Sequence, residues 1–165
     1  MKGKSLTAAL LLCTTAGALL AAPITEKELK VSACQYAKMQ QGILSLDVPA
    51  GKETHTDRTK VYMTLDFAKL KANGKKLVIS GEMKMTGVTK PKDVWNGAKA
   101  MLTYSTNGEK VYPSFLTGKT FGTTDWTKFR KAVLIPADAK NGIVCFGLQD
   151  ASGKIQFRNL DLSVE

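Results

Sequence analysis

Apolar and polar residues alternate with a period of two along most of the chain, and helical spacing is rare. In an extended strand this alternation places apolar side chains on one face and polar side chains on the other. It predicts strands over residues 42–48, 61–67, 76–86, 98–104, 126–135, 143–149 and 155–164. About eight short strands at such intervals are typical of a β-sandwich. The segment 25–30 is also compatible with a short helix.

Two irregularities in this alternation carry information about the sheets. The segment 143–149 is apolar almost throughout, which indicates a strand with both faces covered. In the last predicted strand the apolar phase slips between Phe157 and Leu160, which predicts a β-bulge near Arg158 and Asn159. No long helical segment is available to connect parallel strands. We therefore predict an all-β fold, an antiparallel two-sheet β-sandwich.

The N-terminal residues have the three parts of a secretory signal peptide. Two lysines precede an apolar run over residues 6–16, and small residues follow it. The triplet that ends at Ala18 matches the A-x-A cleavage pattern, and a cut after Ala21 is the alternative. The apolar run is shorter than the ~20 residues of a membrane span. We predict a signal peptide over 1–21 and a single β-sandwich domain over 22–165, in a secreted or periplasmic protein.

The three cysteines bear on anchoring and on stability. Lipoprotein anchoring through Cys13 is disfavoured, because Leu12 precedes it where a small residue is needed. An oxidising compartment would permit a disulfide between Cys34 and Cys145, and such a long loop is stabilised by roughly 4–5 kcal/mol. Cys145 lies in an apolar run, however, where buried free thiols are common. The sequence leaves a disulfide and two free thiols open as alternatives.

The chain is strongly basic, with 24 Lys and Arg against 14 Asp and Glu and a formal net charge of +10. Such a charge favours anionic partners. The lysines are scattered singly, however, and no nucleic-acid-binding motif is present. We therefore expect a lysine-rich surface with a bias toward acidic glycans, no nucleic-acid partner and a monomeric protein. No segment after the leader is apolar enough to cross a membrane.

Residues that carry catalysis are sparse in this sequence. His55 is the only histidine, which argues against a zinc site. Gly118-Lys119-Thr120 is not a phosphate-binding loop, because Pro113 stands where the first glycine is needed. No Gly-x-Ser-x-Gly motif is present, and no pattern pairs two carboxylates as a glycosidase needs. We therefore expect neither an enzyme nor a bound cofactor.

Short motifs follow one another in a distinctive order along the middle and the end of the chain. They are Trp95-Asn96-Gly97, Gly122-x-x-Asp125-Trp126, Val133–Ala139, Gly147-Leu148-Gln149 and Ser152–Phe157. Together they resemble galactose-binding-like jelly rolls, the carbohydrate-binding modules that accompany bacterial glycoside hydrolases. Many such modules carry an aspartate for a structural calcium after the last aromatic residue. Here Arg158 follows Phe157 and would oppose a cation, so calcium is disfavoured.

The resemblance implies a non-catalytic module that holds a glycan by aromatic stacking and hydrogen bonds. The candidate ligand-binding residues are Trp95, Lys99, Tyr104, Glu82, Lys84, Gln149 and Arg158. Tyr112 is a further aromatic candidate, and Trp126 is expected to cap the core. Each has a structural alternative, because a tryptophan beside a glycine can pack on the sheet and outward charges are usually only solvated.

Two other functions remain open from the sequence. The alternative to glycan binding is a structural or protein-interaction domain of the cell envelope, with the same fold and no sugar site. A hydrolase with an unrecognised pair of carboxylates is the third hypothesis. Fold alone does not decide among them, because one fold hosts many functions.

Overall fold

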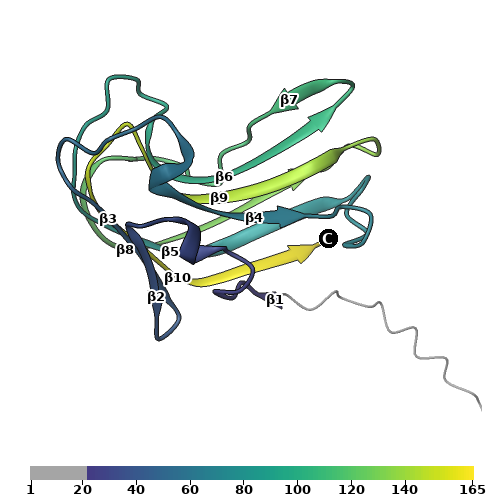
Figure 1. Cartoon of the computed structure of the whole chain (residues 1–165). Coiled ribbons are helices and arrows are strands. Elements are labelled where there is room, and N and C mark those ends of the chain that lie inside the picture. The colour runs from purple at the N-terminus through teal and green to yellow at the C-terminus, as the bar shows by residue number, and fades with distance from the viewer. Residues whose placement is uncertain (1–21) are drawn as a thin grey trace, which may run out of the picture.

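The computed structural model describes residues 22–165, so the predicted signal peptide and Cys13 lie outside the described residues. Two stacked layers of strands are visible in Figure 1. The strands are β1 (Ala22–Pro23), β2 (Ala37–Gln40), β3 (Ile43–Val48), β4 (Lys60–Leu65), β5 (Lys76–Val88), β6 (Gly97–Thr106), β7 (Glu109–Val111), β8 (Gly122–Leu134), β9 (Lys140–Gln149) and β10 (Gly153–Val164). Two short 3₁₀ helices, η1 (Val31–Ala33) and η2 (Asp57–Thr59), lie between strands. None of the helices in residues 22–165 is long and apolar enough to span a bilayer.

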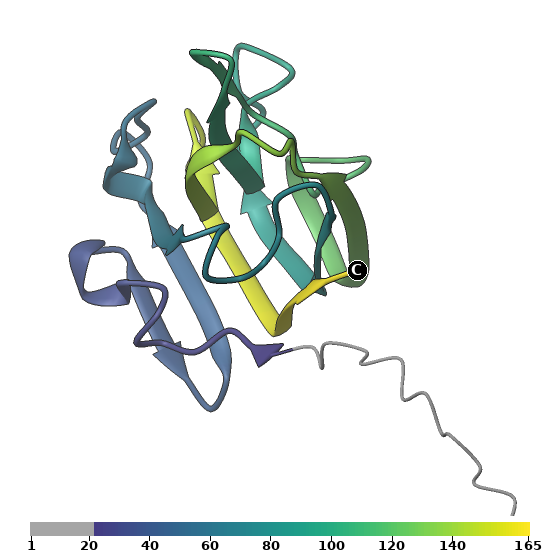
Figure 2. The ribbon, with the colours of Figure 1, turned by 90° about the vertical axis from the view of Figure 1, so that its right-hand side faces the viewer.

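The strands form two antiparallel sheets. In the six-stranded sheet the order is β2-β3-β10-β5-β8, and β1 also pairs with β10. In the four-stranded sheet the order is β4-β9-β6-β7. Figure 2 shows the yellow β10 between the blue β3 and the teal β5, although these strands are far apart in sequence. The predicted antiparallel two-sheet β-sandwich is confirmed.

Aromatic side chains from both sheets meet at the centre of the core. Phe146 of β9 and Phe157 of β10 pack edge to face, with ring centroids 5.2 Å apart. Phe129 of β8 packs on the other side of Phe157 at 6.4 Å. Edge-to-face pairs of this kind stabilise beyond their buried area by about 0.5–1.5 kcal/mol. The central strands of the two sheets are therefore joined through Phe157.

The alternation located the long strands well and the short ones poorly. The strands β2 and β7 were not predicted, and β8 begins at Gly122 rather than at residue 126. The segment 25–30 forms hydrogen-bonded turns instead of a helix, with the Leu29 N–H donating to the Thr25 carbonyl at 3.3 Å. β2 and β7 are short strands at the edges of their sheets, and so few residues cannot show a clear period.

The predicted bulge in the last strand is confirmed. The register between β10 and β5 shifts between Arg158 and Asp161. Asn159 has φ 52°, a left-handed conformation that asparagine tolerates better than most residues. The extra residue lets both Phe157 and Leu160 lie in the core, because two polar residues, Arg158 and Asn159, separate them where regular alternation allows one.

The prediction that the segment 143–149 is covered on both faces is confirmed for residues 144–149, which are all buried, and fails only at Ile143. Val144, Phe146 and Leu148 pack into the core, as expected. The intervening residues Ile143 and Cys145 point to the outer side of the four-stranded sheet, where they line a hollow. Cys145 is nevertheless only 3 % exposed, whereas Ile143 is 37 % exposed, so neighbouring side chains of the groove cover this face in part without a third layer of strands.

The alternative of a disulfide between Cys34 and Cys145 is not realised. Both thiols are free and buried. The Cys34 thiol, at the end of η1, donates to the Arg58 carbonyl at 3.2 Å, on the side of β4 where the Tyr62 N–H donates to the Leu29 carbonyl. Cys145 lies on the other side of that strand, in β9, where it pairs with Tyr62. A strand between the two cysteines separates them, because neighbouring strands are about 4.8 Å apart.

We expect both cysteines to be recovered as free thiols. When the protein is unfolded without reductant and alkylated, peptide mapping should find the label on Cys34 and on Cys145. In the native protein the labelling at pH 8 should be slow, because burial raises the pKa of both thiols, that of Cys145 to about 11, and only the thiolate reacts. A cross-linked peptide joining the two residues would contradict this structure.

A second prediction concerns Gly147, which has φ 150° in the middle of β9. A Cβ atom there would lie 2.8 Å from Lys60 Cα and 3.0 Å from Lys60 Cγ. We expect Gly147→Ala to lower the free energy of unfolding by about 3 kcal/mol or more, because strain and overpacking add. Urea denaturation measures this change.

The matched control is Gly118→Ala, since Gly118 has φ 100° and no atom within 4 Å of its Cβ position. It should cost only the backbone strain, about 1–2 kcal/mol. Equal losses in the two variants would show that the contact with Lys60 is unimportant.

Candidate functional site

The outer face of the four-stranded sheet is hollowed into a groove of about 810 Å³. Side chains from β4, β9 and β6 form its floor in cross-strand rows, because residues that pair across an antiparallel sheet point the same way. The rows are Lys60–Gly147–Lys99 and Tyr62–Cys145–Met101, with Ile143 and Thr103 beyond them. The walls come from loops and from β7, through His55, Asp57, Trp95, Lys110, Tyr112, Ser114 and Thr120. Gln149 and Ala98 complete the lining.

Trp95 stands on one wall with its side chain exposed while its backbone is held in place. The residue is 67 % exposed. The Lys99 ammonium donates to the Trp95 carbonyl, and the buried Asn96 side chain donates to Asp150 Oδ2 at 2.8 Å. Gly97 has φ 93° and no Cβ, which lets the Thr120 carbonyl accept from the Ala98 N–H at 2.7 Å. The indole is therefore presented to solvent on a fixed backbone and is not packed on the sheet.

A polar cluster closes the groove at the end nearest this loop. His55 Nδ1 lies 2.8 Å from Asp150 Oδ2, which also accepts from Asn96. The Gln149 amide nitrogen lies 3.0 Å from His55 Nε2. With the Nδ1 proton donated to Asp150, Nε2 is the acceptor for the Gln149 amide. The cluster holds the loop that carries His55 against the end of β9.

Two lysines lie on the floor on either side of Gly147. Lys60 is 6 % exposed and Lys99 is 8 % exposed, which is rare for lysine. The Lys60 ammonium donates to the His55 carbonyl at 3.3 Å and lies 3.8 Å from Asp57 Oδ1. Burial lowers the pKa of Lys99, and the charge of Lys60 lowers it further. Both ammonium groups therefore tie wall loops to the floor at the expense of their own hydration.

The floor also contains a polar atom with no partner. The Tyr62 hydroxyl is buried and makes no hydrogen bond among the described residues. Burial raises the pKa of Tyr62, and the neighbouring Asp57 carboxylate raises it further. The hydroxyl is therefore near enough to the Asp57 carboxylate to interact with it, although the two groups do not form a hydrogen bond of good geometry.

Three of the seven predicted ligand-binding residues come together in this groove. They are Trp95, Lys99 and Gln149, and the further candidate Tyr112 also lines the groove. Tyr104 does not join them, since it is 6 % exposed and packs edge to face on Phe67 in the core. Its position in β6 has the same parity as the core residues of that strand, so its ring points inward.

The other three predicted residues lie on the opposite side of the molecule. Glu82, Lys84 and Arg158 point outward from the six-stranded sheet, because their neighbours Met83 and Phe157 fill the core. Arg158 binds Glu82 through Nε at 2.7 Å and Nη2 at 2.6 Å, and Lys84 binds Asp125 at 3.1 Å. The sandwich separates these side chains from the groove, so the predicted set cannot act on one ligand.

This outer surface also corrects the expectation for Trp126. Its ring does not cap the core and lies under the Arg158 guanidinium, 4.1 Å from ring centroid to Cζ. The Arg158 partner lowers the pKa of Glu82. Within residues 22–165, no group of three or more His, Cys, Asp or Glu side chains is arranged to hold a metal.

Several lining residues were missed by the sequence analysis, above all Lys60, Tyr62 and His55. Lys60 and Tyr62 alternate with the core residues Val61 and Met63, so their outward direction was readable from the sequence. What the sequence did not show is that β4 pairs with β9 and so brings Tyr62 beside Cys145.

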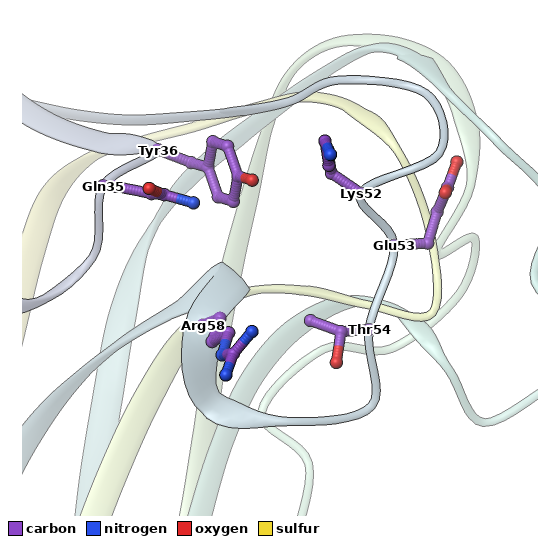
Figure 3. A pocket seen from close by; sticks show the side chains of 6 residues that line it. All are labelled: Gln35, Tyr36, Lys52, Glu53, Thr54 and Arg58. Carbon is purple, nitrogen blue, oxygen red and sulfur yellow. The ribbon is translucent and has the colours of Figure 1, made fainter.

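A second hollow, of about 450 Å³, lies between the segment before β2 and the loop after β3. Figure 3 shows Tyr36 and Arg58 facing it and the Glu53 carboxylate pointing away from it. Its lining consists of Gln35, Tyr36, Lys52, Glu53, Thr54 and Arg58. It is little more than half the size of the groove, and no residue predicted to bind ligand lies in it. The groove is therefore the better candidate site.

Comparisons with known proteins identify the fold. No protein-family profile and no curated protein sequence matches this chain. Among solved structures, a xylan-binding domain of carbohydrate-binding module family 22 matches with a TM-score of 0.60 and 14 % identity, over 91 % of this chain and 96 % of that one. The C-terminal family 22 module of Clostridium thermocellum Xyn10B gives 0.55 and 14 %, over 79 % and 83 %. A structure described as a family 4 carbohydrate-binding module gives 0.53 and 16 %, over 78 % and 75 %.

These matches confirm the predicted jelly-roll fold. The chain has the β-sandwich of carbohydrate-binding modules, as its motif order indicated. At such low identity the likeness concerns the arrangement of the chain and not its ligand.

The buried charge of Lys99 leads to a prediction about stability. The pKa of Lys99 is lowered in the folded protein, so at neutral pH its charge opposes folding. We expect Lys99→Met to raise the midpoint of thermal unfolding at pH 7 by about 2–4 °C, the shift that about 1 kcal/mol gives in a domain of this size. The substitution removes the hydrogen bond from the Lys99 ammonium to the Trp95 carbonyl. This carbonyl lies in an exposed loop, where a water molecule can donate to it instead.

The destabilisation caused by the Lys99 charge should decrease as the pH rises. Above the lowered folded pKa, native Lys99 is neutral while the unfolded chain still binds the proton, so the penalty falls as pH rises toward 10.5. The advantage of Lys99→Met should therefore shrink over that range. The exposed Lys128→Met is the control and should shift the midpoint little at any pH. A lower midpoint for Lys99→Met at pH 7 would contradict the prediction.

Proposed function

We propose that this protein is a secreted, non-catalytic carbohydrate-binding module that holds a glycan in the groove. The observation that carries the proposal is Trp95, whose ring is exposed while Lys99, Asn96 and Gly97 hold its backbone. An aromatic ring on a fixed backbone stacks on the apolar face of a sugar with little loss of entropy. Tyr112, 57 % exposed, offers a second ring in the lining of the groove.

The floor of the groove supplies the polar contacts that a sugar needs. Thr103 and Gln149 present a hydroxyl and an amide, and the Tyr62 hydroxyl makes no hydrogen bond within residues 22–165. Concave sites with a few convergent polar groups among apolar side chains are typical of small-molecule and sugar binding. The aromatic walls and the polar floor therefore match the two faces of a sugar ring.

The lining of the groove supports binding without catalysis. Asp57 is the only carboxylate among the described residues that line it. Glycosidases of the usual kind need two carboxyl groups on either side of the bond that they cleave. The matched structures add support at the level of fold, because their names describe carbohydrate-binding modules and, in one case, a xylan-binding domain. Export is supported by the leader-like N-terminal sequence.

A protein partner is the second candidate, and one observation favours it. Val94 is 78 % exposed beside Trp95, so the loop displays two apolar side chains together. Neighbouring exposed apolar residues can mark a protein interface as well as a sugar platform. Glycan binding is the better supported of the two, because the patch borders a groove with polar groups on its floor.

We expect Trp95→Ala and Tyr112→Ala each to weaken binding to a glycan at least about tenfold, the loss of about 1.4 kcal/mol that removal of a stacking ring gives. Affinity electrophoresis against xylan, glucan, mannan, galactan and acidic polysaccharides, followed by calorimetry on the best ligand, measures the change.

Trp126→Ala is the matched control, since it removes an indole from the far face of the sandwich. It should leave the affinity unchanged. Absence of binding to every polysaccharide, or equal affinity of wild type and Trp95→Ala, would refute the proposed function. A stable protein partner whose capture depends on Val94 would support the second candidate instead.

A further inference from the structure

The most unusual feature of the groove is the pair of lysines on its floor. Lys60 and Lys99 belong to β4 and β6 and both pair with Gly147 of the strand between them. Twice the spacing of neighbouring strands puts their backbones roughly 10 Å apart. Because Gly147 has no side chain, the stem of Lys60 crosses β9, with its Cγ 3.0 Å from where a Cβ would be. Two largely buried cations thus line the same groove, on either side of Gly147.

The charges of these lysines are poorly compensated within the protein. Lys99 lies within 4 Å of no carboxylate of residues 22–165, and its ammonium has one protein acceptor, the Trp95 carbonyl. Lys60 has the His55 carbonyl at 3.3 Å and the 84 % exposed Asp57 carboxylate at 3.8 Å. Each ammonium can donate three hydrogen bonds, so donors remain unused. A buried charge without a counter-ion is costly.

The cations on the opposite face show the contrast. Arg158 is paired with Glu82 at 2.6 Å and Lys84 with Asp125 at 3.1 Å. These two cations are each paired with a carboxylate, whereas Lys99 in the groove is not, among the residues that the structure describes. Burial lowers the pKa of Lys99 most, the charge of Lys60 lowers it further, and the Asp150 carboxylate offsets this only in part.

We propose that the groove takes an acidic glycan and seats its anionic substituent, a carboxylate or a sulfate ester, over Gly147 between the ammonium groups of Lys60 and Lys99. The proposal rests on glycan binding in the groove and names the class of glycan. The anion would accept hydrogen bonds from both lysines and relieve their mutual repulsion, while Trp95 stacks on a sugar ring beside it. Lys110 on the wall adds a third cation nearby.

The test uses two pairs of polymers that differ in charge. Polygalacturonate is compared with its carboxyl-reduced neutral form, and dextran sulfate with dextran, by affinity electrophoresis at 150 mM salt. Wild type should bind the charged member of one pair at least about tenfold more tightly, as expected for charge-assisted hydrogen bonds. Preference within the first pair identifies a carboxylate ligand, and preference within the second identifies a sulfate ester.

The double variant Lys60→Met/Lys99→Met should abolish that preference. The control Lys75→Met/Lys128→Met removes the same charge from exposed positions and should keep it, which separates the site from the general basicity of the chain. Thermal unfolding checks that both variants fold. If the double variant does not fold, the single variant Lys99→Met takes its place. It should reduce the preference for the charged polymer over the neutral one at least about threefold.

Three outcomes would overturn the proposal. One is equal binding of charged and neutral polymers by wild type, and another is equal loss in the two double variants. The third is binding only to neutral glycans such as xylan, which leaves the proposed function standing. Absence of binding to every polymer, charged or neutral, refutes the proposed function itself.

Discussion

Phe146 and Phe157 meet edge to face where β9 and β10 cross at the centre of the sandwich, with ring centroids 5.2 Å apart. This contact sets the phase of both strands, because side chains alternate between faces and one residue of slip would turn the phenyl rings out of the core. With Phe146 inside, Cys145 and Gly147 must face outward. The floor of the groove therefore follows from the packing of the core.

The polar features of the groove oppose the stability of the fold. Gly147 adopts a φ that other residues avoid; and, in the part of the chain that the structure describes, Lys99 is buried without a carboxylate partner and the Tyr62 hydroxyl makes no hydrogen bond. Each of these costs free energy that the core has to offset. On the outer face of the six-stranded sheet Arg158 and Glu82 satisfy each other, although Asp161 Oδ1 in the same sheet is buried without a hydrogen bond among the described residues. Unsatisfied groups of this kind gather where a protein binds ligands, since preorganised sites keep polar groups ready for a partner.

Much of the fold could be predicted from alternation alone. The long strands, the antiparallel sandwich and the bulge at Asn159 were all visible in the sequence, because each is a local pattern of apolar and polar positions. The site was predictable only in part. Trp95 was identified as an aromatic residue in a loop next to Gly97, and the structure shows it exposed. Lys60 was missed, because no local signal marks a lysine that will be buried by a neighbouring strand.

The sequence by itself determined which side chains point into the core and which point out, since the direction of a side chain in a strand depends only on its parity. Only the tertiary structure decided which outward side chains share a surface. Lys99 and Gln149 belong to the four-stranded sheet, whereas Lys84 and Arg158 belong to the six-stranded sheet, on the opposite face. Pairing between strands far apart in sequence makes that assignment, and it depends on how both sheets fill one core.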